Sequence, residues 1–207
     1  MDQKIILIGI IEENEKRQIL NLTKQLLLKS NYKFEYGHSS DDIVCYCNES
    51  KILIFFDLVY SKIDEYRINN FTFDILIHSY IENYNIEDIK SLLRKSKICI
   101  INSDKGDLNS LLSDLQDSIV ITYGLNSKST ITISSCNVDE NIDVNLCLQR
   151  DIVHLNNNKV EPFEFNIQLL SDDESLLYPI LSSSTLNLLL GDSILNKKPF
   201  EDIILTI

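Results

Sequence analysis

The chain has 207 residues, 44% of them hydrophobic, which is enough for one full hydrophobic core. Its formal net charge of −12 at pH 7 argues against nucleic acid or an anionic membrane surface as a partner. Neither an apolar run long enough to span a membrane nor a secretory leader pattern is present, so we expect a cytoplasmic protein with a single domain over residues 1–207.

Short apolar runs rich in Ile and Val alternate with stretches of helical period through the first 124 residues. This alternation is typical of βαβ units around a parallel sheet. Strands are predicted over residues 4–10, 32–37, 43–47, 52–57, 73–79, 97–104 and 118–124. Helices are predicted over residues 13–30, 86–95 and 107–116.

The pattern changes in the C-terminal half. Strand alternation without intervening helices covers residues 129–139, 144–153 and 162–170, which predicts an antiparallel extension. Residues 155–159 (LNNNK) are expected to form a hairpin turn. A helix over residues 175–191 is expected to end at Gly191, and a last strand covers residues 201–207. The predicted fold class is α/β, with three layers, a mostly parallel sheet and an antiparallel β extension.

The cysteine pattern suits a reducing compartment. The five cysteines lie mostly in apolar strand-like runs, as buried thiols do: Cys45, Cys47, Cys99, Cys136 and Cys147. Cys45 and Cys47 are too close in sequence for a usual zinc pair. The excess of Ile, Asn and Lys over Ala, Gly and Arg suggests a bacterial protein from an AT-rich genome.

Several segments, taken in order, carry a resemblance to a known family. Residues 100–104 read IINSD and residues 120–135 read VITYGLNSKSTITISS. Together they are similar to the central domain of Mur ligases, in which Asn-x-Asp-Asp precedes a helix, a Tyr-Gly strand and an Ala-x-Val-x-Ala strand. Residues 57–74 align with another family segment without a gap, and residues 176–191 replace a helix ending in Leu-Gly. The resemblance implies a P-loop NTPase-like domain alone, without the N-terminal UDP-precursor domain or the C-terminal ligase domain.

The turn after the first strand aligns with the family's phosphate-binding loop, Gly-Thr-Asn-Gly-Lys-Thr. The aligned residues are Glu12, Glu13, Asn14, Glu15, Lys16 and Arg17. Both glycines have become glutamates, and Arg17 stands where a hydroxyl would hold Mg²⁺. Because a phosphate loop works through backbone N–H groups and a positive helix end, three carboxylates there are expected to repel ATP. The resemblance therefore implies a degenerate P-loop.

The other family positions are kept only in part. Asp57 aligns with a glutamate that assists a second metal ion, but Val59 and Tyr60 replace the adjoining Ser-Ser. Asn83 and Tyr84 replace a metal-associated Asp-His pair. The resemblance implies no catalytic residue. It leaves vestigial nucleotide positions at Asn14, Lys16, Asn102 and Asp104, and a vestigial metal position at Asp57.

Each of these positions also has a structural explanation. Lys16 and its acidic neighbours can be solvated charges in a first helical turn, where each acid stabilises the helix by about 0.3–1 kcal/mol. Asp57 is placed at a strand end, where ligand sites gather but exposed acids are also ordinary. His78 is expected to be a satisfied, partly buried imidazole. A serine hydrolase is disfavoured because no Gly-x-Ser-x-Gly elbow is present.

Two functions from different classes follow from the resemblance. The first is a pseudoenzyme, a non-catalytic binding or regulatory module linked to cell-wall and peptidoglycan processes, with a protein partner or a homo-oligomer and no cofactor. The second is a remnant ATP-dependent amide ligase or nucleotide-binding subunit that works with other chains and uses ATP-Mg²⁺. An intermediate case is a sensor that binds a nucleotide at residues 100–104 without the triphosphate loop.

Overall fold

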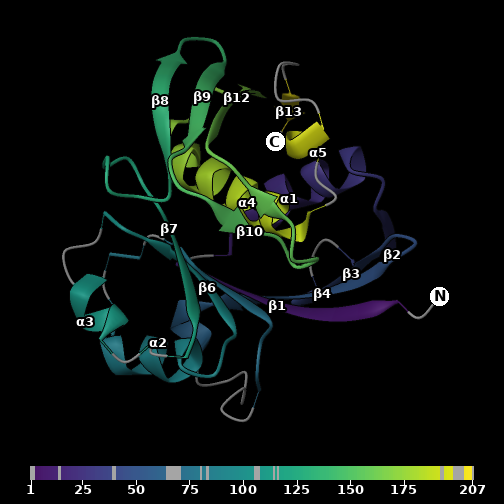
Figure 1. Ribbon diagram of the computed structural model, residues 1–207, viewed down its shortest axis with the longest axis vertical. Coiled ribbons are helices and arrows are strands. Elements are labelled where there is room, and N and C mark those ends of the chain that lie inside the picture. The colour runs from purple at the N-terminus through teal and green to yellow at the C-terminus, as the bar shows by residue number, and fades with distance from the viewer. Residues whose placement is uncertain are drawn as a thin grey trace. The chain divides into compact units, whose positions relative to one another are not determined.

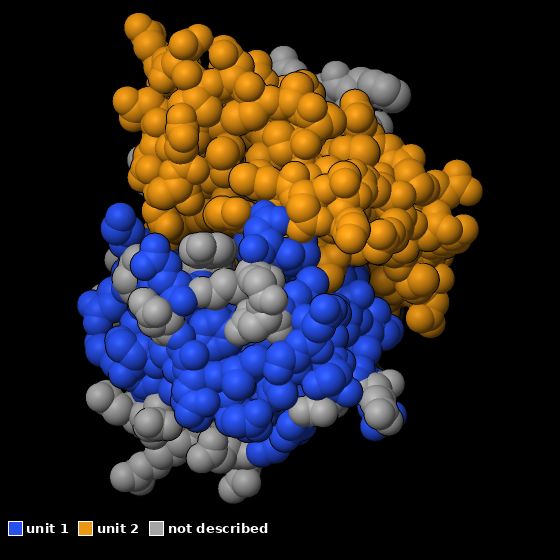
Figure 2. Space-filling view, turned by 90° about the vertical axis from the view of Figure 1, so that its left-hand side faces the viewer, with its two compact units in different colours: residues 1–17, 31–121 blue, residues 18–30, 122–207 orange. Residues whose placement is uncertain are grey.

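The computed structural model describes residues 3–13, 15–38, 41–63, 71–79, 81–82, 84–104, 108–113, 115, 117–191, 194–197 and 203–206. The chain forms two compact units, coloured separately in Figure 2. The first contains residues 1–17 and 31–121, and the second contains residues 18–30 and 122–207. This division does not test the expectation of a single domain, which stays a prediction.

A largely parallel sheet forms the centre of the first unit, in the order β7-β6-β5-β1-β4-β3-β2 (Figure 1). Its strands are β1 (Lys4–Glu12), β2 (Lys33–Tyr36), β3 (Ile43–Cys47), β4 (Lys51–Val59), β5 (Ile75–His78), β6 (Ile98–Asn102) and β7 (Ile119–Tyr123), whose end belongs to the second unit. β1 pairs in parallel with β4 and β5, and β5 with β6, whereas β3 pairs antiparallel with both β2 and β4. Every residue of β5 and β6 is buried, which explains why their sequences are apolar without alternation.

Two helices of the first unit, α2 (Ile86–Leu93) and α3 (Leu108–Leu112), share an apolar cluster with side chains of β1, β4, β5 and β6. Gly9 lies at the middle of β1 beside this cluster. A Cβ atom at Gly9 would lie 2.6 Å from Cδ1 of Leu76 and 3.2 Å from the ring of Phe73. Gly9 therefore permits close packing of two core side chains, and it is not part of a phosphate loop.

The second unit combines four further strands of the 11-stranded sheet with helices. Its strands are β8 (Ile131–Val138), β9 (Ile142–Leu148), β12 (Phe163–Leu170) and β13 (Ile203–Thr206), with a separate hairpin of β10 (Ile152–Val153) and β11 (Lys159–Val160). Its helices are α1 (Gln18–Lys29), the 3₁₀ turn η3 (Glu174–Leu176), α4 (Leu177–Leu190) and α5 (Ile194–Lys197). β9 pairs antiparallel with both β8 and β12, so the predicted antiparallel extension is confirmed.

Helix α4 packs against α1 and is buried at nearly every position. A helix that is buried on nearly all sides occupies a central position in its unit. The hydroxyl groups of Ser182, Ser183 and Thr185 donate hydrogen bonds to carbonyls within the helix, for example Thr185 Oγ1 to the carbonyl of Leu181 at 2.7 Å. The helix ends at Gly191, whose left-handed φ of 82° confirms the predicted C-cap.

The first helix differs from the prediction in its start. The sequence predicts a helix from residue 13, but α1 begins at Gln18 and has no acid in its first turn. β1 continues as far as Glu12 because it pairs with β4 up to Val59, and Arg17 has a φ of 53°, outside the right-handed helical region. The explanation of the glutamates as first-turn acids is therefore wrong. No helix in the described part of the chain is long and apolar enough to cross a membrane.

Candidate functional site

The turn between β1 and α1 is the position that the sequence compares with a phosphate loop. Glu12 is 5% exposed and ends β1, whereas Glu13, Glu15 and Lys16 are exposed. Asn14 lies outside the described residues. Because Glu12 is a paired residue of the sheet, the backbone at the first aligned glycine position belongs to a strand rather than to an open, anion-binding turn.

The exposed acids of the turn have partners in the first unit. Glu15 forms an ion pair with Lys62, the last residue of the 3₁₀ turn η1 (Tyr60–Lys62) that follows β4. The hydrogen bond from Lys62 and its charge lower the pKa of Glu15. A carboxylate oxygen of Glu13 accepts a hydrogen bond of 3.2 Å from the backbone N–H of Glu82. The glutamates thus connect the turn to two other segments of the unit.

Arg17 forms the centre of a charged cluster. Its Nε lies 3.0 Å from Oδ2 of Asp57, and its Nη2 lies 2.7 Å from Oδ1 of Asp42. Its Nη1 also donates a hydrogen bond of 2.5 Å to the carbonyl of Asp41. Asp57 is only 1% exposed, on β4 opposite Ile10 of β1. The charge of the buried carboxylate is therefore balanced by a guanidinium from the turn.

The contact between Arg17 and Asp57 is an ion pair without good hydrogen-bond alignment. The distance of 3.0 Å is short, yet neither oxygen of Asp57 accepts a well-oriented hydrogen bond from the described residues. Burial raises the pKa of Asp57 to about 6, while Arg17 opposes this rise and Asp42 adds to it. Asp57 is thus mostly ionised at pH 7 but close to its titration range.

Asn102 ends β6 and is completely buried. Its Oδ1 accepts a hydrogen bond of 2.9 Å from the backbone N–H of Asp104. Its Nδ2 is a buried donor that has no acceptor among the described residues. Asn102 and Glu12 both lie at the carboxyl ends of parallel strands. Their strands, β6 and β1, are not adjacent, because β5 lies between them.

Aromatic rings surround the end of β5. His78 ends this strand and is fully buried, so the prediction of a partly buried imidazole is wrong; its ring contacts that of Tyr84 edge to face, with centroids 5.2 Å apart. Tyr84 in turn lies 6.2 Å from the ring of Tyr60, whose hydroxyl accepts a hydrogen bond of 2.5 Å from the backbone N–H of Asn85. Asn83, which aligns with the family's metal-associated pair, lies outside the described residues. Tyr84 thus contributes an aromatic contact at the position of that pair.

The structure thus brings Asp57 and the turn residue Arg17 together. The prediction of Asp57 as a metal position and of four nucleotide positions remains untested. The contacts of Arg17 with Asp42 and Asp57 were not predicted from the sequence. The sequence feature that could have indicated these contacts is Arg17 itself, a cation at the position where the family has a Mg²⁺-binding hydroxyl. The chain also contains the acidic pair Asp41-Asp42 as a possible partner. Within the described residues, no group of three or more His, Cys, Asp or Glu side chains is arranged to hold a metal ion.

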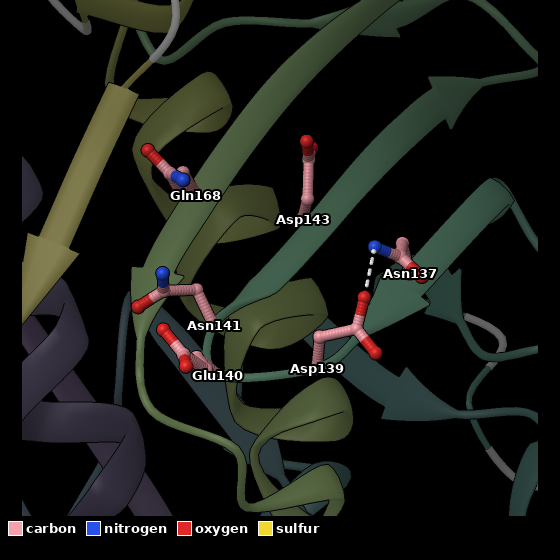
Figure 3. A pocket seen from close by; sticks show the side chains of 6 residues that line it. All are labelled: Asn137, Asp139, Glu140, Asn141, Asp143 and Gln168. Atoms are coloured by element: carbon pink, nitrogen blue, oxygen red, sulfur yellow. Dashed lines mark hydrogen bonds between the residues drawn. The ribbon is translucent and has the colours of Figure 1, made fainter.

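A separate hollow lies on the second unit at the turn between β8 and β9 (Figure 3). It has a volume of about 540 Å³ and is lined by Asn137, Asp139, Glu140, Asn141, Asp143 and Gln168. Nδ2 of Asn137 donates a hydrogen bond of 3.1 Å to Asp139. The lining is acidic and polar and contains no nucleophile paired with a base, so it does not resemble a catalytic centre.

Solved Mur ligases have a similar fold. A UDP-N-acetylmuramoylalanyl-D-glutamyl-2,6-diaminopimelate–D-alanyl-D-alanyl ligase from Acinetobacter baumannii matches with a TM-score of 0.62 at 8% identity, over 92% of this chain and 44% of that one. The MurF ligase from Thermotoga maritima in complex with ADP matches with a TM-score of 0.58 at 14% identity, over 91% and 46%. A UDP-N-acetylmuramoyl-L-alanyl-D-glutamate–2,6-diaminopimelate ligase gives 0.55 at 13% identity, over 79% and 39%.

No protein-family model matches the chain, and no curated protein matches it. The chain spans less than half the length of each of these three ligases. At such low identities the likeness concerns the fold alone. The α/β fold class predicted from the sequence is confirmed, and the chain has a Mur ligase-like fold.

Proposed function

We propose that this chain is a non-catalytic Mur ligase-like protein, a binding or regulatory module in cell-envelope or peptidoglycan assembly. The observation that carries the proposal is the guanidinium of Arg17, 3.0 Å from the buried carboxylate of Asp57. A metal ion bound to this carboxylate would have to displace Arg17 or share Asp57 with it. The residues present therefore do not fit ATP-Mg²⁺.

Two further features support the absence of nucleotide chemistry at the turn. The strand pairing of Glu12 leaves no glycine-rich backbone free to surround a phosphate. Glu13 and Glu15 place carboxylates at the turn that aligns with a phosphate loop, and Lys62 pairs with that of Glu15. The link to the cell envelope rests on the ligases whose fold the chain shares.

Titration calorimetry with ATP and Mg²⁺ tests the proposal directly. We expect no saturable heat from this chain at ligand concentrations up to about 1 mM, because an anionic ligand meets carboxylates instead of an anion-binding loop. The MurF ligase from Thermotoga maritima, which binds ADP in its solved structure, is the matched control with ADP-Mg²⁺. Micromolar, Mg²⁺-dependent binding that is lost in Lys16→Ala would overturn the proposal.

A nucleotide-binding subunit that works with other chains is the second candidate, favoured by the buried Nδ2 of Asn102. An unsatisfied buried donor costs roughly 1–3 kcal/mol, which an acceptor on a ligand would offset. This candidate requires adenosine to bind without Mg²⁺, and Asn102→Leu to abolish that binding. The exposed Asn109 provides the control, because Asn109→Leu should leave adenosine binding unchanged. If adenosine does not bind the unmodified chain, the second candidate fails.

A further inference from the structure

The strand β2 forms an open edge of the sheet in the first unit. It is the last strand in the sheet order, and all four of its residues are exposed. They include two large side chains, Phe34 with 47% of its surface exposed and Tyr36 with 68%. An edge strand with exposed apolar side chains is a template for pairing with another strand.

A comparison with the strand β13 in the second unit shows how an edge can be closed. Gln25 of α1 accepts a hydrogen bond of 2.7 Å from the backbone N–H of Thr206, and its amide donates to the carbonyl of Thr206. The side chain thereby takes the place of a neighbouring strand. Among the described residues, no further strand or turn forms backbone hydrogen bonds with the outer side of β2.

The sequence of β2, KFEY, is complementary to itself when two copies run antiparallel. Lys33 lies opposite Cys47 of β3, and the carboxylate of Glu35 accepts a hydrogen bond of 3.1 Å from the same cysteine. Both charges are therefore on one face of the sheet. Phe34 is on the other face, where its ring contacts Tyr46 with centroids 5.5 Å apart.

Antiparallel pairing centred on Phe34 has a defined register. It places Lys33 of each copy opposite Glu35 of the other, and the two Phe34 rings opposite each other. Opposite charges and aromatic pairs at directly facing positions stabilise a pair of strands. In this register the two copies are related by a twofold rotation, which is the usual symmetry of a closed dimer.

The charges of β2 favour a second copy over an unrelated strand. The strand is short and has a bulge between Phe34 and Tyr36, so a pairing would be confined to the residues around Phe34. Lys33 would be unpaired against an apolar strand but is paired against Glu35. Two copies with a net charge of −12 each repel one another at most surfaces, whereas β2 has one positive and one negative residue.

We propose that β2 is the interface of a homodimer, formed by antiparallel β2–β2 pairing centred on Phe34. Because only one short strand from each copy takes part, the dimer should be weak, with a Kd in the micromolar range. Its formation does not depend on whether the chain binds nucleotides. A test of β2 pairing therefore measures the association of two chains and is independent of ligand binding at the turn of residues 12–17.

Sedimentation velocity over a concentration series tests this interface. We expect a monomer–dimer equilibrium for the unmodified chain and an increase in Kd of about tenfold or more for Lys33→Glu and for Glu35→Lys, since each places like charges opposite each other. The double variant Lys33→Glu/Glu35→Lys should return to the original Kd. Lys128→Glu, which makes the same charge change as Lys33→Glu at an exposed residue of the second unit, is the control and should dimerise like the unmodified chain.

Mixing the two single variants gives the sharpest outcome. One variant presents two acids and the other two lysines, so an equimolar mixture should form a heterodimer although each variant alone is monomeric. This result also shows that both variants are folded. A monomeric unmodified chain at all concentrations, a dimer insensitive to both single changes, or a mixture that stays monomeric would each overturn the proposal.

Discussion

Replacement of Arg17 by methionine is expected to lower the free energy of unfolding by about 3 kcal/mol at pH 7.5. Methionine keeps a similar length of apolar side chain but removes the cation beside Asp57, which is 1% exposed. The contacts of Arg17 with Asp42 and with the carbonyl of Asp41 are lost as well. Protonation of Asp57 limits the cost, because a buried carboxylate without a partner takes up a proton instead of staying charged. Urea unfolding followed by circular dichroism measures the change.

The loss of stability in Arg17→Met should depend on pH. Below about pH 5 Asp57 is largely protonated with or without Arg17, so the loss should shrink to the contribution of Asp42 and Asp41. As the pH rises above 7 the loss should increase, because holding the proton on Asp57 becomes more costly. Arg94 is the matched control. It is 45% exposed and lies 3.9 Å from Glu87, so Arg94→Met should change stability by less than about 0.5 kcal/mol. Equal effects of the two substitutions at pH 7.5 would show that Arg17 does not neutralise a buried charge.

The strands were predictable where burial decides the local sequence. β3 has the predicted bounds Ile43–Cys47, and the entirely buried β5 and β6 lie within their predicted ranges, because an apolar Ile-rich run bounded by polar residues has few alternatives. The turn at residues 155–159 was also predictable from its asparagines, and Asn157 takes a left-handed φ of 66° there. The two-residue strands β10 and β11 and the four-residue helix α5 were too short to give a periodic signal.

The site was predictable in its positions but not in its contacts. Asp57 and Asn102 were placed at strand ends from the sequence, and both lie there or close to it. The predicted start of the first helix was wrong. Acids are common in first helical turns, but here the pairing of β1 with β4 extends the strand to Glu12, and α1 begins only at Gln18. The ion pair of Arg17 with Asp57 joins residues 40 positions apart, from different elements, and no local pattern encodes that proximity.

Replacement of Asp57 by asparagine is expected to stabilise the chain at neutral pH, by up to about 3 kcal/mol. Burial raises the pKa of Asp57 from its usual value of 3.8 to about 6, so the folded chain binds this proton more tightly than the unfolded chain does. The contribution of Asp57 to stability is therefore most favourable below about pH 4, and it is lost as the pH rises through about 6. Asparagine has a similar shape without the charge, and Arg17 keeps its contacts with Asp42 and Asp41.

The informative quantity is the difference in unfolding free energy between Asp57→Asn and the unmodified chain, because other titrating groups cancel in it. This difference should be close to zero at pH 4, rise between pH 4 and 6 and level off above pH 7. A difference that is constant over this range would contradict a raised pKa of Asp57. A less stable variant at pH 7.5 would show instead that the attraction between Arg17 and Asp57 exceeds the cost of burying the carboxylate. In that case the ion pair would hold the turn to β4 by net attraction.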